Sequence, residues 1–274
     1  MKIAQFYKND RIRLGLVKEN VLVPIDYNGR MEELIRSEST DVTPGGDPIS
    51  LDEVHLAPPL TSPSKIIAIG LNYLDHVRES KGTVPETPLV FSKFPSSLVG
   101  HRGQITWSTG LTQKVDFEAE LAVIMGRKTR RCPEEEAMNH IFGYTCANDV
   151  SARDLQFGDG QWVRGKSLDT FCPLGPWITT VEEIPDPHDL TIKSRLNGVL
   201  MQDSNTSFMI FKIPYLIGFL SRAFTLLPGD VILTGTPHGV GAFRDPSLYM
   251  NDGDQIEVEI EGIGTLSNTC RTFP

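Results

Sequence analysis

The chain has 274 residues and a formal net charge of −9, and 39% of its residues are hydrophobic and 22% charged. An acidic surface repels phosphate backbones and anionic lipids, so a nucleic-acid-binding protein and a membrane-surface protein are disfavoured. The composition is that of a folded globular protein, and the length allows one large domain with a smaller one. A small anionic substrate remains compatible, because a bound cation and a few basic residues can reverse the field inside one cleft.

Cysteines and apolar segments narrow the class further. The four cysteines are far apart and form no CxxC pair, so neither a zinc cage nor a dithiol redox motif has support. The first residues lack the apolar stretch of a signal peptide, and the longest apolar runs, such as residues 66–71, are too short to span a bilayer. We therefore expect a cytoplasmic protein with reduced thiols.

The first part of the chain predicts a small, mostly β unit. Three short strands and then one helix are expected at residues 3–7, 13–17, 21–25 and 31–37. A loop rich in Gly and Pro at 43–48 and a stiff connector at 58–63 place a boundary between them. We divide the chain into a small N-terminal domain, residues 1–58, and a larger second domain, residues 59–274. The first is too short for a substantial core of its own, so we expect it to pack on the second.

The remainder is also mostly β, with one strong helix at residues 211–224. Its apolar residues recur at helical spacing: Ile213, Leu216, Ile217, Leu220 and Phe224. Asn197-Gly198 is a hairpin signal. Strands are expected at residues 65–70, 89–93, 117–125, 142–149, 176–181, 190–195, 199–203, 230–233, 255–261 and 264–270. This pattern predicts an α+β fold that is predominantly β.

Residues 116–125, DFEAELAVIM, are the most informative stretch. Side chains alternate across a strand, so Glu118 and Glu120 share a face that becomes apolar at Ala122 and Ile124. Burying two like charges there without compensation costs several kcal/mol. A divalent cation removes that cost, and Mg²⁺ or Mn²⁺ prefers such oxygen ligands. The alternative is an edge strand with two solvated glutamates.

A third carboxylate, Asp149, ends the strand expected at 142–149. If the chain turns helically there, Arg153 and Gln156 follow on the same face, at i+4 and i+7. A metal ligand, a fixed cation and an amide would then lie together. The alternative is that Asp149 caps the helix and forms an i,i+4 ion pair with Arg153.

Three further motifs carry reactive side chains. His76 and Glu79 are three residues apart, so in a helical loop the carboxylate can orient the imidazole as a general base for water. The alternative is a surface turn with an incidental histidine. Lys166 can neutralise negative charge that develops beside a metal. The loop at 233–239, LTGTPHG, either binds a substrate carboxylate through hydroxyl and N–H groups or is an ordinary turn.

Residues 160–167 match the phosphate-binding pattern G-x-x-x-x-G-K-[ST] letter for letter. A P-loop follows a strand and opens a helix, whereas GDG precedes this segment and a stretch containing proline follows it. The intervening Gln161, Trp162 and Val163 are bulky for a phosphate cradle. We therefore reject a nucleotide site here.

Seven segments resemble the fumarylacetoacetate hydrolase family, and they occur in the order of that family between Lys65 and Cys270. They are IGLNYLDHVRE, PLVFSKFPSSLVG, VDFEAELAVIMGR, FGYTCANDVSARDLQ, GKSLDTFCPLGP, LNGVLMQDSNT and LLPGDVILTGTPHGVG. Each is weak alone, but the ordered set outweighs the alternatives above. The resemblance implies a mixed β-roll, a small N-terminal domain like that of many bacterial members, a homodimer, and Mg²⁺ or Mn²⁺ as cofactor.

The resemblance also implies roles for residues at matching motif positions. His76 and Glu79 resemble the water-activating pair on a flexible lid, and Lys166 resembles the lysine that stabilises the developing anion. The implied residues are Glu118, Glu120 and Asp149 for the metal; His76, Glu79 and Lys166 for catalysis; and Arg153, Gln156 and Thr236 for the substrate.

The predicted function is that of a metal-dependent hydrolase that cleaves a C–C bond in 2,4-dioxo acids such as acylpyruvates, with oxaloacetate decarboxylation as a further activity. The alternative is an isomerase or lyase on a related diacid, of the 2-hydroxyhepta-2,4-diene-1,7-dioate isomerase or ureidoglycolate lyase type. A non-catalytic ligand-binding relative is a third reading, against which the pairing of His76 with Glu79 argues. In each case the expected partner is a small anionic 2-oxo acid.

Overall fold

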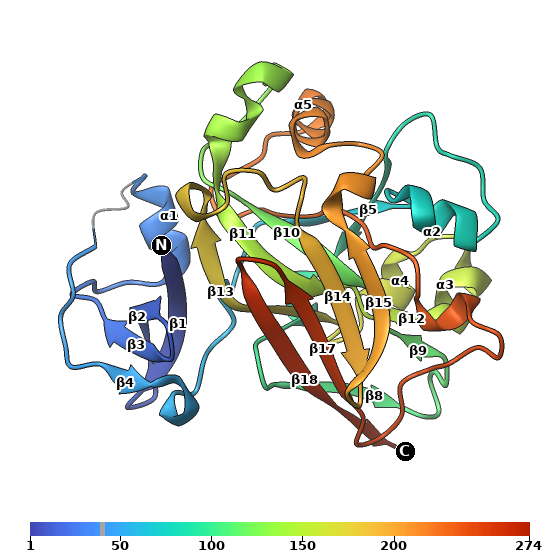
Figure 1. Cartoon of the computed structure of the whole chain (residues 1–274), viewed down its shortest axis with the longest axis horizontal. Coiled ribbons are helices and arrows are strands. Elements are labelled where there is room, and N and C mark those ends of the chain that lie inside the picture. The colour runs from blue at the N-terminus through green and yellow to red at the C-terminus, as the bar shows by residue number, and fades with distance from the viewer. Residues whose placement is uncertain (39–41) are drawn as a thin grey trace.

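The computed structural model describes residues 1–38 and 42–274, and most of its regular structure is β (Figure 1). Its strands are β1 (Lys2–Lys8), β2 (Arg11–Lys18), β3 (Val21–Pro24), β4 (Ile49–Ser50), β5 (Ile66–Gly70), β6 (Leu89–Lys93), β7 (Leu98–Val99), β8 (Gln104–Ser108), β9 (Val115–Asp116), β10 (Ala119–Met125), β11 (Ile141–Asn148), β12 (Ser151–Ala152), β13 (Cys172–Thr180), β14 (Thr191–Leu196), β15 (Val199–Asn205), β16 (Val231–Leu233), β17 (Gln255–Ile260) and β18 (Gly264–Phe273). Its α-helices are α1 (Met31–Arg36), α2 (Leu74–Glu79), α3 (Arg153–Asp159), α4 (Val163–Lys166) and α5 (Ile213–Ala223). The predicted fold class, α+β and predominantly β, is confirmed.

Two large sheets organise the described residues. The larger has the order β4-β3-β2-β1-β13-β11-β10-β16-β5-β6, with β7 paired to β13. The second has the order β15-β14-β17-β18-β8, and β12 pairs with β9 separately. Most pairs are antiparallel, but three are parallel: β16 with β5, β18 with β8 and β13 with β7. The arrangement is therefore a mixed β structure, and its short helices α2, α3 and α4 gather on one side (Figure 1).

The N-terminal strands extend the larger sheet. β1 pairs antiparallel with β13, where Lys2 lies opposite Thr179 and Ile3 opposite Ile178. The apolar face of α1, including Met31, packs in the same core cluster as residues of β10 and β13. The expectation that this segment packs on the rest is confirmed. The division at residue 58 stays a prediction, because the sheet itself continues across it.

β10 runs between two apolar clusters and positions the carboxylates. Leu121 and Val123 pack in one cluster with the apolar face of α5, whereas Ala122 and Ile124 pack in the other. Alternation along residues 119–125 is thus as predicted. The predicted helical stripe is confirmed as well, and its members pack in the first cluster or against it: Ile213, Leu216, Ile217, Leu220 and Phe224.

The strand predicted at 117–125 is confirmed for residues 119–125 but not for its first two residues, because the chain leaves the ladder between β9 and β10. The N–H of Glu118 donates to Asn148 Oδ1 at 2.9 Å, and the N–H of Ala119 donates to Gln202 Oε1 at 2.9 Å. Side-chain oxygens therefore replace the carbonyl partners that a continuous strand would use.

The condition set for Asp149, a helical turn that places it on one face with Arg153 and Gln156, is not met. β12 follows Asp149 and pairs with β9, so α3 begins only at Arg153. Asp149 consequently does not lie on the face of α3, and Arg153 pairs with Asp116 and Glu118 instead. Smaller differences are the earlier start of β13, the extension of β18 to Phe273, and β8, for which we had no expectation.

Among the described residues, the longest α-helix is α5, with 11 residues. None of those described helices has the length and apolar character needed to cross a membrane.

Candidate active site and metal centre

A cavity of about 270 Å³ lies between the short helices, β10 and the loop after β16. Seven of the nine site residues expected from the sequence line it: His76, Glu118, Glu120, Arg153, Gln156, Lys166 and Thr236. The other two lie directly behind the wall, where Glu79 contacts His76 and Asp149 contacts Lys166. The structure therefore brings all nine residues together, although they come from positions 76 to 236 of the chain.

Three carboxylates gather at this cavity, two on its wall and Asp149 directly behind them. Glu118 precedes β10, Glu120 lies on β10, and Asp149 follows the neighbouring strand β11. Antiparallel pairing sets Ala119 opposite Asn148 and so carries Asp149 to the two glutamates. One oxygen of each carboxylate lies within 4.8 Å of the others, and all three side chains are buried.

Buried cations surround these carboxylates. Lys166 Nζ lies 2.6 Å from Glu118 and 2.7 Å from Asp149. Arg153 Nη2 lies 2.7 Å from the other oxygen of Glu118. On the far side, Lys93 Nζ lies 2.5 Å from Asp149 and also donates to the carbonyl oxygen of Lys166. Two of the three carboxylates are therefore held by cations, and Glu120 is not among them.

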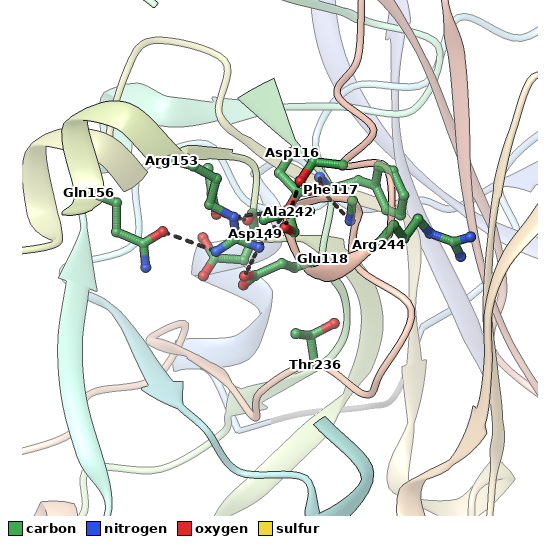
Figure 2. Close-up of polar contacts among 12 residues, drawn as sticks. Asp116, Phe117, Glu118, Asp149, Arg153, Gln156, Thr236, Ala242 and Arg244 are labelled. Atoms are coloured by element: carbon green, nitrogen blue, oxygen red, sulfur yellow. Dashed lines mark hydrogen bonds and ion pairs between the residues drawn. The ribbon is translucent and has the colours of Figure 1, made fainter. Parts of the chain in front are cut away.

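Asp116 anchors Arg153 and the wall of the cavity. Arg153 pairs with it through Nε at 2.9 Å and Nη2 at 2.8 Å, while the N–H groups of Gly241 and Ala242 donate to it at 2.7 and 2.9 Å. Figure 2 shows the guanidinium held between Asp116 and Glu118, with Gln156 bonded to its outer side. Gly241 leaves no room for a side chain, since a Cβ there would lie 1.9 Å from the Leu248 carbonyl oxygen and 2.6 Å from Asp116.

Lys93 and Asp116 belong to the site but had no role in our sequence analysis. Both lie inside motifs quoted there, as the lysine of PLVFSKF and the aspartate of VDFEAE. A charge at the end of an otherwise apolar strand is the signal that marks Lys93, because such a residue is rarely buried without a partner. No comparable signal marks Asp116, which follows the polar stretch Thr112-Gln113-Lys114.

The charges of the site do not balance. Four buried carboxylates, Asp116, Glu118, Glu120 and Asp149, face three buried cations, Lys93, Arg153 and Lys166. Burial raises the pKa of Glu120 well above its usual value, and the neighbouring Asp149 and Glu118 raise it further. Oε2 of Glu120 accepts one hydrogen bond, from the Gly235 N–H at 2.7 Å. The all-oxygen set is therefore short of positive charge at Glu120 and fits a divalent cation.

The pKa values of Glu118 and Lys166, unlike that of Glu120, shift in the directions that keep these side chains charged. Burial would raise the pKa of Glu118, but the charges of Lys166 and Arg153 outweigh burial and lower it. Burial would lower the pKa of Lys166, but Asp149 and Glu118 raise it. The structure thus keeps Glu118 ionised and Lys166 charged beside the cavity.

His76 and Glu79 face the cavity from α2. Glu79 Oε2 lies 3.1 Å from His76 Nδ1, and its Oε1 accepts a hydrogen bond from the Gly239 N–H at 2.8 Å. The imidazole also meets the ring of Phe243 edge to face, with ring centroids 5.6 Å apart. A carboxylate on Nδ1 favours the tautomer with a proton there, which leaves Nε2 as a base.

Thr236 lies on the loop after β16, below Glu118 in Figure 2. Gln202 Nε2 donates to its hydroxyl oxygen at 2.8 Å and to the Pro237 carbonyl oxygen at 2.9 Å. The Gly160–Ser167 segment does not form a P-loop, because α4 ends at Lys166 instead of beginning after it.

Asp116→Asn is expected to lower the free energy of unfolding by about 3 kcal/mol, because it leaves the buried Arg153 with only part of its compensating charge. Thermal and urea unfolding would measure the loss. Asp203→Asn is the matched control, since Asp203 is exposed and forms only a long contact of 3.8 Å with Lys193. An equal effect of both substitutions would contradict the anchoring role of Asp116.

Comparison with known proteins finds the same family that the sequence motifs resemble. A family model described as fumarylacetoacetate (FAA) hydrolase C-terminal matches residues 65–271, and one described as Rv2993c-like, N-terminal, matches residues 1–59. The chain is 43% identical to a Xenopus laevis protein named oxaloacetate tautomerase fahd2, mitochondrial, over 98% of this chain and 89% of that protein.

Solved structures show the same likeness across the whole chain. A fumarylacetoacetate hydrolase from Exiguobacterium antarcticum has a TM-score of 0.92 and 38% identity, covering 100% of both chains. A 5-carboxymethyl-2-hydroxymuconate delta-isomerase from Mycobacterium smegmatis has a TM-score of 0.84 and 36% identity, also covering 100% of both. The names differ in reaction but all are enzymes. The chain is therefore an enzyme that belongs to the fumarylacetoacetate hydrolase family.

Proposed function

We propose that the chain is a divalent-metal-dependent enzyme that binds a small 2-oxo acid and acts through its enol form. The observation that supports this best is the set of three buried carboxylates within 4.8 Å of one another, with Glu120 lacking a cation. Glu118, Glu120 and Asp149 would hold the ion, and Mg²⁺ and Mn²⁺ both suit their oxygens. When bound, the ion supplies Lewis-acid polarisation of the 2-oxo group.

Groups on the cavity wall would bind and orient the acid. The hydroxyl oxygen of Thr236 accepts from Gln202, so its own proton is available to a substrate carboxylate. Oε1 of Gln156 accepts from Arg153 at 3.0 Å, which fixes the amide and leaves its N–H groups as donors. Lys166 would stabilise the negative charge that develops on the 2-oxo oxygen, because its ammonium already lies against Glu118.

His76 and Glu79 would move the proton. In keto–enol exchange, Nε2 of His76 takes a proton from the carbon next to the keto group, and the electron pair of that C–H bond forms the C=C bond. The keto oxygen gains a proton from solvent, to which His76 returns its own. In hydrolysis, Nε2 takes a proton from water, whose oxygen attacks the distal carbonyl of a 2,4-dioxo acid. The bond between that carbonyl carbon and C3 then breaks, which gives a carboxylic acid and the enolate of pyruvate, and the enolate gains the proton from His76. Glu79 holds the ring and stabilises its charged form in both cases. A protein that only binds ligands has no need for this pair.

We place the keto–enol tautomerisation of oxaloacetate first. The Xenopus relative that is named for this reaction is 43% identical over 98% of this chain. Enolisation needs only an ion-binding site, a charge-stabilising cation and one base, which are the groups assigned above. The same groups support oxaloacetate decarboxylation, in which CO₂ leaves and no base is required.

C–C bond hydrolysis of an acylpyruvate is the second candidate. The outer cavity wall is largely apolar, with Leu71, Phe91, Phe157 and Trp162 among its residues. This wall suits an apolar acyl group, which oxaloacetate does not have. An isomerase reaction, as in the name of the Mycobacterium smegmatis protein, would also use the enol form.

A substrate panel tests the proposal. The purified protein, with and without Mg²⁺ or Mn²⁺, is assayed on oxaloacetate tautomers, on oxaloacetate decarboxylation and on acylpyruvates of increasing chain length, by ultraviolet absorbance. We expect tautomerisation to be the fastest reaction and chelation to lower every rate by roughly a hundredfold or more. Acylpyruvate cleavage without tautomerisation would favour the second candidate. No turnover of any 2-oxo acid would refute both.

The homodimer and the cytoplasmic location stay predictions. Size-exclusion chromatography with light scattering checks the first, and localisation of the tagged full chain checks the second. A small anionic 2-oxo acid remains the proposed partner of the site.

A further inference from the structure

The outer face of α2 is tied to two distant parts of the chain. Asp75 Oδ2 accepts a hydrogen bond from Ser204 Oγ on β15 at 2.5 Å, and it lies 2.9 Å from His238 Nδ1 on the loop after β16. Asp75 Oδ1 accepts from the His76 N–H at 2.8 Å. One carboxylate thus joins the helix that carries His76 to a strand and to a loop.

The helix depends on such contacts for its orientation. α2 has only six residues, and its N-cap residue Tyr73 makes no side-chain capping bond. A helix this short has little stability of its own, so tertiary contacts decide where it lies. Asp75 ties its first turn, and the bond from the Gly239 N–H to Glu79 ties its last residue. Both contacts end on the same loop, at His238 and Gly239.

The same strand, β15, positions the two sides of the cavity. Gln202 on β15 donates to Thr236 and so holds the loop after β16. The Oε1 atom of Gln202 accepts from the N–H of Ala119, which lies between Glu118 and Glu120. Ser204, also on β15, holds Asp75. Residues two apart on a strand share a face, so Gln202 and Ser204 fix the substrate loop and α2 relative to one frame.

We infer that Asp75, held by Ser204 and His238, is a positioning residue that sets His76 and Glu79 against the cavity. The inference rests on the proposed function, in which His76 moves the proton. His238 has no direct part in the reaction, because its ring is partly exposed and is aimed at Asp75. A carboxylate can only accept, so Nδ1 of His238 must carry the proton of this contact.

The test uses the full chain with metal, four single variants and the double variant Asp75→Asn/His238→Ala. Asp75→Asn removes the negative charge and replaces one acceptor oxygen by a donor, and His238→Ala removes the donor of the contact. His238→Asn restores a donor near the Nδ1 position. Asp203→Asn is the control, because Asp203 is the exposed neighbour of Ser204 on β15. Opening of α2 is measured without reference to activity, by trypsin cleavage after the exposed Arg78 and Lys81 with the fragments identified by mass.

Cleavage at these two sites should be about fivefold faster in Asp75→Asn and His238→Ala, as expected for the loss of one charge-assisted hydrogen bond. The double variant should be no faster than the faster single variant, because both remove one contact. His238→Asn and Asp203→Asn should resemble the wild type. Tautomerisation should lose kcat about fivefold with little change in KM, whereas decarboxylation, which needs no base, should keep its rate.

The outcomes separate the two proposals. Unchanged cleavage in both Asp75→Asn and His238→Ala overturns the tie itself, whatever the kinetics show. Faster cleavage with unchanged tautomerisation, or with equal loss of decarboxylation, overturns the positioning role and leaves a structural contact. A wild-type chain that turns over no 2-oxo acid refutes the proposed function and the positioning role with it, while the cleavage rates still decide whether the tie exists.

Discussion

Glu120→Gln is expected to abolish metal binding and activity while leaving the fold at least as stable as that of the metal-free wild type. Burial and the neighbouring Asp149 and Glu118 raise the pKa of Glu120, so this carboxyl is the group that the metal-free site tolerates least as an anion. Glutamine keeps the size and the oxygen that accepts from the Gly235 N–H. It removes only the charge that a bound ion would need.

The measurement is metal analysis after dialysis against Mn²⁺, together with thermal unfolding with and without the ion. In the wild type, a free ion concentration of about 100 times the Kd adds about 2.7 kcal/mol to the free energy of unfolding. We expect no such gain in Glu120→Gln, and a fall in kcat/KM of roughly a hundredfold or more, since an ion-dependent electrostatic contribution is lost.

Glu118→Gln is the comparison that makes this result specific. Glu118 is paired with both Lys166 and Arg153, so its loss leaves two buried cations short of compensation. We expect it to lose the metal as well, but also to lower the free energy of unfolding by about 3 kcal/mol. Full retention of the metal in both variants, or in Glu118→Ala, would refute the assignment of the ligands.

The raised pKa of Glu120 also predicts how the stability of the metal-free protein depends on pH. The folded state raises the pKa of Glu120, so above the ordinary value the folded chain retains a proton that the unfolded chain has lost. Stability of the metal-free wild type therefore falls as the pH rises from the usual glutamate range toward the raised pKa. Glu120→Gln should remove this part of the pH dependence. Metal binding displaces the same proton, so the apparent affinity of the ion should increase with pH.

The sequence could predict the carboxylates because their signal is local. Glu118 and Glu120 are two residues apart, and strand alternation sets them on one face. The assignment of Asp149 as a metal ligand depended, in addition, on the ordered motifs that resemble the family. The positions of Lys93 and Asp116 could not be read in this way, since Lys93 pairs with a residue 56 positions away and Asp116 bonds to N–H groups 125 and 126 positions away.

The two local departures from the predicted pattern have the same cause. Alternation predicted a strand that includes Phe117 and Glu118, and a helical turn after Asp149 would have set it on one face with Arg153. In the structure, Asn148 and Gln202 take the backbone N–H groups of Glu118 and Ala119, and β12 pairs with β9. At the site, therefore, contacts with distant segments decide the backbone conformation, and local periodicity does not. The side chains predicted for the site nevertheless lie close together.

His76→Ala is expected to separate the reactions that this site supports by whether they need a base. Hydrolysis and tautomerisation each require a proton to be taken, from water or from carbon, so both should fall by roughly 10²–10⁴-fold. Decarboxylation of oxaloacetate releases CO₂ without a base and should keep most of its rate. Glu79→Gln should have a smaller effect in the same direction, because Glu79 orients the ring and does not itself take the proton.

Metal content must stay unchanged for this separation to be meaningful. His76 lies on α2, outside the carboxylate set, so His76→Ala should bind Mn²⁺ as the wild type does. His55→Ala, an exposed histidine of the N-terminal segment, is the matched control and should leave all rates unaffected. If decarboxylation falls as far as hydrolysis while the metal is retained, His76 is not the base that distinguishes the reactions.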